Sequence, residues 1–128
     1  MQKIKIIDNL YIKSGASGAE AETQTTRLVG ALAAKSGAVY VLVHEVSADT
    51  RIAIAFQHGP DGENWTPGSS DLFDSGGSTG IKIGLSATGT PVDLTGVDQV
   101  NIIPKIQEIS ATNVVTARIS VWVILTPF

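Results

Sequence analysis

Cysteine is absent from this chain of 128 residues. Its absence excludes disulfides, cysteine-ligated zinc and thiol nucleophiles together, so packing must stabilise the fold. Aromatic residues make up 5% of the chain and charged residues 16%, against roughly 25% charged residues in typical soluble domains. Because so weakly charged a chain leaves apolar surface exposed when alone, the composition predicts buried contacts between subunits.

The chain also lacks a basic cluster and an uninterrupted apolar run of membrane length. The nine basic residues are scattered from Lys3 to Arg118 and the net charge is −3, so we expect no nucleic-acid partner. The longest apolar tract, 28–46, is interrupted by Lys35 and Glu45, and a membrane helix needs ~20 apolar residues. The N-terminus alternates polar and apolar residues, unlike a signal peptide, so we expect synthesis in the cytoplasm and no membrane partner.

What the chain does have is period-two alternation of apolar and polar residues in segment after segment. Glycine and proline lie mainly between these segments, as they do in antiparallel sandwiches. The pattern predicts a single all-β domain over residues 1–128, a jelly-roll-like antiparallel β-sandwich with an N-terminal segment, 1–21, able to extend from it. Strands are expected near 3–7, 38–47, 51–57, 80–86, 98–109 and 114–126.

Turn residues at 47–50 separate two of the clearest strand patterns, 38–46 and 51–57. We therefore expect these two strands to pair as a hairpin. Segment 19–34 leaves two alternatives, because its Ala, Glu and Leu residues favour a helix while its glycine and threonine residues favour an extended chain.

Three single residues allow more specific predictions about the strands and turns. Pro104 lies inside a strand pattern and cannot donate to a sheet ladder, which predicts an edge strand or a bulge. Trp122 stands between valines in a strand that we expect to lie in the core. Trp65 follows a turn, where a tryptophan either caps the sandwich or stacks on a ligand.

Residues that could carry catalysis are few. Neither His44, inside a strand pattern, nor His58, at a turn, has a nucleophile elbow near it, so we expect no catalytic residue and no enzymatic activity. Oxygen ligands suited to calcium gather in one polar segment, but their order does not match a calcium-binding loop, and we expect neither a metal site nor a cofactor. These ligands are Asp61, Glu63, Asn64, Asp71 and Asp74.

One stretch, Ile52 to Thr66, combines an alternating strand, an Asp-Gly turn and a tryptophan. It resembles a hairpin of small structural proteins of tailed bacteriophages, which include capsid decoration and tail-associated subunits, and also of discoidin-like carbohydrate-binding modules. The phage resemblance implies a non-enzymatic virion subunit, synthesised in the host cytoplasm, that forms a homo-oligomer such as a trimer and binds a major capsid or tail protein. A carbohydrate-binding module is the alternative, although the low aromatic content argues against it.

Two segments are candidates for the partner contact that this resemblance implies. The polar stretch 58–79 has three large apolar groups, Trp65, Leu72 and Phe73, which a neighbouring subunit would cover. In the N-terminal segment, Lys3 and Lys5 flank a short strand that is able to add to a neighbour's sheet edge. The competing possibility is that both segments fold back on their own subunit.

Overall fold

The computed structural model describes residues 2–23, 26–29, 34–59, 63–68, 71–86, 91–94 and 99–127. None of the described segments is a helix long and apolar enough to span a membrane. The described chain is mostly strand. In order, its elements are β1 (Gln2–Lys13), the 3-10 helix η1 (Ala16–Gly18), β2 (Ala21–Glu22), β3 (Thr26–Val29), β4 (Ala34–Val46), β5 (Thr50–Gly59), β6 (Thr66–Pro67), β7 (Phe73–Asp74), β8 (Gly84–Ser86), β9 (Val92–Asp93), β10 (Gln99–Glu108) and β11 (Thr116–Pro127).

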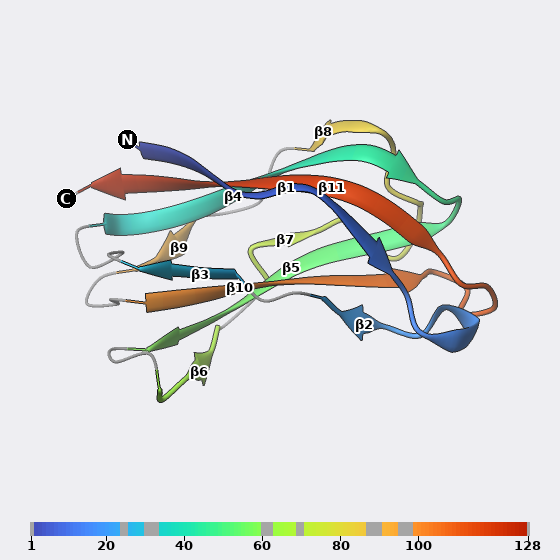
Figure 1. The fold of residues 1–128 in the computed structure, drawn as a ribbon, viewed down its shortest axis with the longest axis horizontal. Helices are drawn as coiled ribbons and strands as arrows, with labels where there is room; N and C mark the ends of the chain where they lie inside the picture. The colour runs from blue at the N-terminus through green and yellow to red at the C-terminus, as the bar shows by residue number, and fades with distance from the viewer. Residues whose placement is uncertain are drawn as a thin grey trace.

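Two antiparallel sheets form the layers of a sandwich (Figure 1). Sheet A has the order β1-β11-β4-β8, with β9 also paired to β4. Sheet B has the order β2-β10-β5-β6, with β3 also paired to β10 and β7 to β5. When β2 with β3, β6 with β7 and β8 with β9 are each taken as one strand position, the order is 1-8-3-6 in sheet A and 2-7-4-5 in sheet B. This is the jelly-roll arrangement, and it confirms the predicted all-β sandwich.

The core consists mainly of isoleucine and valine side chains from the facing sides of the two sheets. In β4, Val39, Val41 and Val43 are buried, while the side chains between them are only partly covered. β11 repeats this pattern with its buried valines and isoleucine, and β5 contributes Ile52 and Ile54 from the opposite sheet. The alternation read from the sequence is thus the alternation between the core and the outer faces.

The expected hairpin between 38–46 and 51–57 is wrong. β4 belongs to sheet A and β5 to sheet B, so the turn at 47–49 carries the chain from one layer to the other. Ser47 anchors the turn to sheet A through its backbone N–H, which donates to the carbonyl of Thr116 at 3.0 Å. The buried Thr50 hydroxyl closes the turn by donating to the carbonyl of Ser47 at 2.9 Å. Because β4 pairs with β11 and β5 with β10, each strand has a partner from a distant part of the chain.

Pro104 lies in an inner strand, so the predicted edge strand is wrong, whereas the predicted irregularity is present on one side, because the registers of β10 with β2 and with β3 differ by one residue across Pro104. β10 pairs with β5 in unbroken register, with Pro104 opposite Ile54. The carbonyl of Pro104 accepts hydrogen bonds from Thr23, on the side away from β5. In antiparallel strands the N–H and C=O of one residue point to the same side. The missing N–H therefore faces the gap between β2 and β3, and the ladder with β5 loses nothing.

Segment 19–34 is extended where the structure describes it, as β2, β3 and the start of β4, which confirms the extended alternative there; residues 24–25 and 30–33 lie outside the described part. Of the strand expected at 80–86, only β8 is found. Before it, the N–H of Ile81 donates to the carbonyl of Thr50 in β5, and the chain turns at Gly84, the first residue of β8, which has a φ of +126°. The N-terminal strand β1 pairs with β11 in the home sheet. The Asp61-Gly62 turn lies outside the described residues.

The turn between β10 and β11 is organised by a buried carboxylate. One oxygen of Glu108 accepts hydrogen bonds from the N–H and hydroxyl of Thr112, both at 2.7 Å, from the N–H of Asn113 at 2.9 Å and from the hydroxyl of Ser110 at 2.9 Å. These donors, with the backbone N–H of Thr112 first, lower the pKa of Glu108 from 4.5 to about 2. A side chain at Gly18 would meet both Glu108 and Asn113, so η1 packs directly on this turn.

We expect Glu108→Gln to lower the thermal stability at neutral pH, because a neutral amide accepts these four hydrogen bonds less strongly than a carboxylate does. A folded-state pKa below the unfolded value stabilises the protein above about pH 4.5, and that contribution is lost as the pH falls toward 2. Thermal melts of both proteins should therefore differ most at neutral pH and converge across this window. Glu45→Gln, at an exposed glutamate of β4, is the matched control. A constant difference down to pH 2 would contradict this role of the carboxylate.

Candidate functional site

The stretch predicted to contact a partner, 58–79, folds back on sheet B where it is described. Leu72 and Phe73 lie in the hydrophobic core, with 7% and 6% of their surface exposed. The N–H of Leu72 donates to the carbonyl of Ile54 at 2.7 Å, and β7 places Phe73 opposite the same residue. Both side chains would have to leave the core to contact another subunit. Trp65 is half-buried beside the turn that leads into β6.

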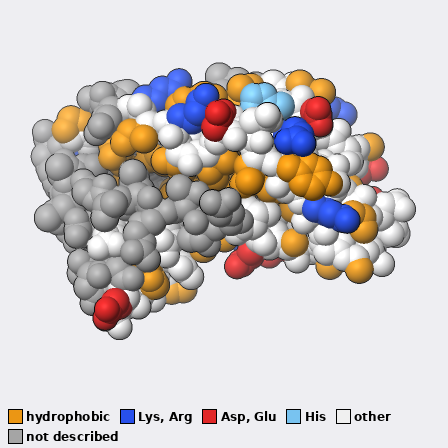
Figure 2. Space-filling model, in the orientation of Figure 1, with side chains coloured by type: hydrophobic (Ala, Val, Ile, Leu, Met, Phe, Trp, Pro, Cys, Tyr) orange, Lys and Arg blue, Asp and Glu red, His pale blue; other side chains and the backbone are white. Residues whose placement is uncertain are grey.

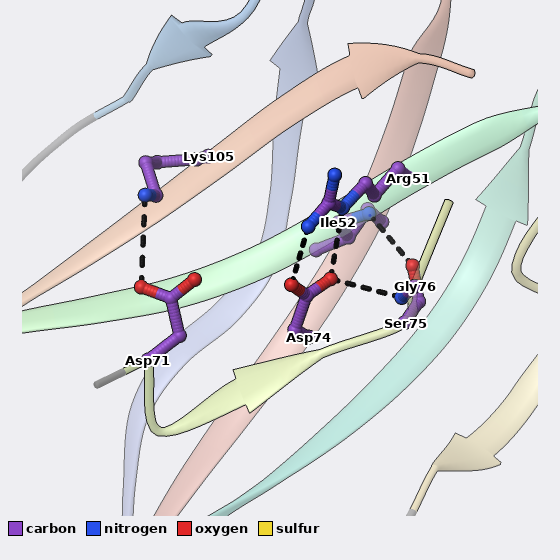
Figure 3. Close-up of polar contacts among 7 residues, drawn as sticks. All are labelled: Arg51, Ile52, Asp71, Asp74, Ser75, Gly76 and Lys105. Carbon is purple, nitrogen blue, oxygen red and sulfur yellow. Dashed lines mark hydrogen bonds and ion pairs between the residues drawn. The ribbon is translucent and has the colours of Figure 1, made fainter.

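A bidentate ion pair fastens β7 to β5 (Figure 3). The guanidinium of Arg51 donates to the two carboxylate oxygens of Asp74, at 2.9 Å from Nε and 2.5 Å from Nη2. The N–H of Gly76 adds a bond to Asp74 at 2.9 Å, and the hydroxyl of Ser75 accepts from the N–H of Ile52 at 3.0 Å. The hydrogen bond from Arg51 is the main cause that holds the pKa of Asp74 below its ordinary value. The pair of Arg51 and Asp74, which we call the clamp, thus stays ionised at neutral and mildly acidic pH.

A small hollow of about 90 Å³ lies next to this clamp, and charges of both signs line it. Lys105 reaches Asp71 across it at 3.6 Å (Figure 3). Of the five oxygen ligands singled out in the sequence, Asp71 and Asp74 are therefore engaged by cations, and Asp61 lies outside the described residues. Within the described ranges, no group of three or more histidine or acidic side chains is placed to hold a metal ion.

His44 approaches a serine, but the arrangement is not that of a catalytic triad. Its Nε2 lies 2.8 Å from the hydroxyl of Ser120, while the carboxylate of Asp8 contacts that hydroxyl at 3.5 Å. A triad requires the carboxylate on the second ring nitrogen of the histidine, to orient it as a base. Ser120 is 1% exposed and also accepts a bond from the N–H of Asn9 at 2.9 Å. The serine therefore fills the bulge in β1, where the register with β11 shifts.

Lys3 and Lys5, the other predicted contact residues, lie over aromatic rings on the outer face of sheet A. The ammonium of Lys5 is 4.9 Å from the ring centre of Trp122. The ammonium of Lys3 is 5.4 Å from the same ring and 5.6 Å from the ring of Tyr40. These are cation–π distances, which restrict where each lysine side chain can lie. We call these four residues, from three adjacent strands, the cationic face.

A second cation–aromatic contact lies further along the same sheet. The guanidinium of Arg118 is 5.4 Å from the ring centre of Tyr11, which is 51% exposed, and 3.6 Å from the carboxylate of Glu45. The visible surface over β1 and β11 accordingly shows basic side chains among apolar ones (Figure 2). Sequence reading missed Tyr40, Tyr11 and Arg118 as members of this surface.

Trp122 was expected in a core strand; the strand is confirmed, but its ring faces outward. Val121 and Val123 on either side are buried at 0% and 3% exposure, so alternation directs the residue between them to the outer face. Tyr40 lies opposite Trp122 in the register of β4 and β11 and has the same orientation. The parity of each aromatic residue within its strand was the signal that could have placed both on the surface.

The sequence matches no protein-family model and no curated protein. The structure, however, is similar to the VP2 subviral particle of infectious bursal disease virus, with a TM-score of 0.59 and 12% identity, and to a structure of the Gt strain of the same virus, with a TM-score of 0.62 and 9% identity. The shared feature is the fold. Each match covers 98% of this chain but 32% of the viral chain, so the chain spans about a third of the proteins it resembles.

We expect Asp74→Asn to loosen β7, because the neutral amide loses its ionic attraction to Arg51. Bidentate, half-exposed ion pairs contribute on the order of 1 kcal/mol, so the amides of Leu72 and Ser75 should exchange with deuterium about fivefold faster. Asp71→Asn is the matched control, since the contact of Asp71 with Lys105 is longer, at 3.6 Å. Equal protection of these amides in wild type and Asp74→Asn would show that the clamp does not hold the segment.

Proposed function

We propose that this chain is a non-enzymatic structural subunit of a virus particle, in the role of a capsid decoration or auxiliary protein. The observation that carries the proposal is the structural similarity, over 98% of this jelly-roll chain, to a viral protein solved as a subviral particle. Jelly rolls occur in viral capsids, in lectins and in some enzymes, so the fold narrows the role without fixing it.

Surface chemistry supports the part of the proposal that concerns assembly. Trp122, Tyr40, Leu42 and Ile124 all lie on the outer face of sheet A, and each is only half-buried. In a monomer these apolar groups stay partly in contact with water and contribute little to stability, whereas a neighbouring subunit would bury them. The proposed homo-oligomer, such as a trimer, would use surface of this kind.

The finer parts of the role rest on the sequence resemblance of residues 52–66. They are a bacteriophage origin, a major capsid or tail protein as the partner, and a place in the virion after synthesis in the host cytoplasm. The absence of catalysis is proposed because the carboxylate beside Ser120 and His44 contacts the serine instead of the histidine. No role for nucleic acid is proposed, since the chain carries a net charge of −3.

The alternative function, a carbohydrate-binding module, is favoured by the fold, which lectins share, and by Trp65, half-buried beside a turn. The aromatic rings of sheet A do not favour it. Lysine ammonium groups lie over Trp122 and Tyr40, at the position where a sugar ring would stack. If the alternative is correct, the sugar must therefore bind at Trp65 or displace the lysines.

Light scattering of the purified chain separates these two functions. A structural subunit should elute as a homo-oligomer, with a mass that is a multiple of the chain mass, because its half-buried apolar face needs a neighbour. A glycan array with wild type and Trp65→Ala tests the alternative, with His58→Ala as a control for general damage to this end of β5. A stable monomer that binds a glycan through Trp65 would replace the proposed function with the alternative.

A further inference from the structure

The charges of this chain are divided unevenly between its strands. The three long strands of sheet A carry five basic residues (Lys3, Lys5, Lys13, Lys35, Arg118) and two acidic ones (Asp8, Glu45), a net charge of +3. The whole chain has nine basic and twelve acidic residues, so the remainder has four basic and ten acidic residues, a net charge of −6. The excess positive charge of this acidic protein is therefore concentrated on three adjacent strands of one sheet.

Lys3 and Lys5 are held over aromatic rings, unlike the mobile lysines of an ordinary surface. Each ammonium of the cationic face lies 4.9–5.6 Å from a ring centre, and the two rings belong to adjacent strands in register. Holding a long side chain over a ring reduces the rotamer entropy that is lost when the charge later binds a partner. Such an arrangement favours a ligand that carries fixed negative charges.

The same charges disfavour a symmetric pairing in which the two cationic faces lie directly over each other. An isologous contact would bring the ammonium groups of Lys3 and Lys5 against those of the second copy, and like charges placed together cost several kcal/mol. A contact between different faces avoids this repulsion. It joins the strands of charge +3 to the remainder of charge −6 and, if its rotation closes, produces a ring such as a trimer.

We propose that the cationic face of one copy binds carboxylates on the sheet B side of a second copy, in a head-to-tail contact. Glu20 and Glu22, exposed on and beside β2 at the edge of sheet B, are suitable carboxylates. The half-buried Ile124 and the parts of the Trp122 and Tyr40 rings that the lysines do not cover form the apolar part of this contact, and the ammonium groups over the rings supply its charge. This inference rests on the proposed function, because it names the interface that assembles the oligomer.

The test measures the association of the full chain by light scattering and sedimentation. Lys3→Glu and Lys5→Glu should each raise the dissociation constant by about tenfold or more, because an attraction becomes a repulsion. Lys82→Glu makes the same charge change at an exposed lysine outside the three strands and should leave the constant within about threefold. Lys5 also pairs with Asp8 at 3.4 Å, so Lys3→Glu gives a result that does not depend on that ion pair. Circular dichroism checks that each variant is folded.

Zero-length carbodiimide coupling of mixed isotope-labelled and unlabelled chains identifies the surfaces. The expected result is an amide between Lys3 or Lys5 of one chain and Glu20 or Glu22 of another. An oligomer that neither lysine variant weakens, or coupling of these lysines only within one chain, would overturn the inference and leave the proposed function standing. A wild-type chain that stays monomeric would instead overturn the proposed function, and the inference with it.

Discussion

The burial of two sheet faces against each other is the constraint on which the rest of this structure depends. With no cysteine in the sequence and no metal cluster in the described part, the sandwich is stabilised by apolar contact between layers. Isoleucine and valine fill the inward positions of β4, β5, β10 and β11. Every inward residue commits its two neighbours to the outer face. The core therefore also determines which side chains are offered to a partner.

That coupling explains why the candidate surface lies on a sheet and not on a loop. The described part of 58–79 uses its apolar groups, Leu72 and Phe73, to extend the core, and its aspartates to fasten itself to β5 and β10. On sheet A, by contrast, the large apolar side chains of Trp122 and Tyr40 point away from the core. The lysines of β1 cover these rings in part and keep the face charged. Lysine side chains over aromatic rings allow the free subunit to stay soluble and still allow the rings to be buried when subunits assemble.

The sequence predicts the fold class well, because period-two alternation is a local property that one segment displays by itself. It does not predict which sheet a strand joins, since that depends on a partner far along the chain. The turn at 47–49 illustrates this, as its composition suits a hairpin equally well. The edge position expected for Pro104 was wrong because the break in pairing that tolerates its missing N–H lies between β2 and β3, on one side of an inner strand. Lys3 and Lys5 were singled out from the sequence, and strand parity could have placed Trp122 and Tyr40 on the outer face. That these four side chains meet depends on the register between β1, β4 and β11, which no single segment displays. The four donors around Glu108 likewise become visible only once the turn is folded.

The pairing of β1 with β11 has a consequence for biosynthesis. Lys3 lies opposite Ile124, so β1 cannot pair with β11, its neighbour in the described sheet, until nearly all of the described chain has left the ribosome. Throughout translation β1 is an unpaired strand with apolar residues, which is the kind of segment that aggregates. Its alternating lysines and its bulge at Asn9 act during this interval as well as in the finished fold, because both discourage pairing with the wrong strand. The residues that we assign to assembly thus also protect the nascent chain before there is anything to assemble.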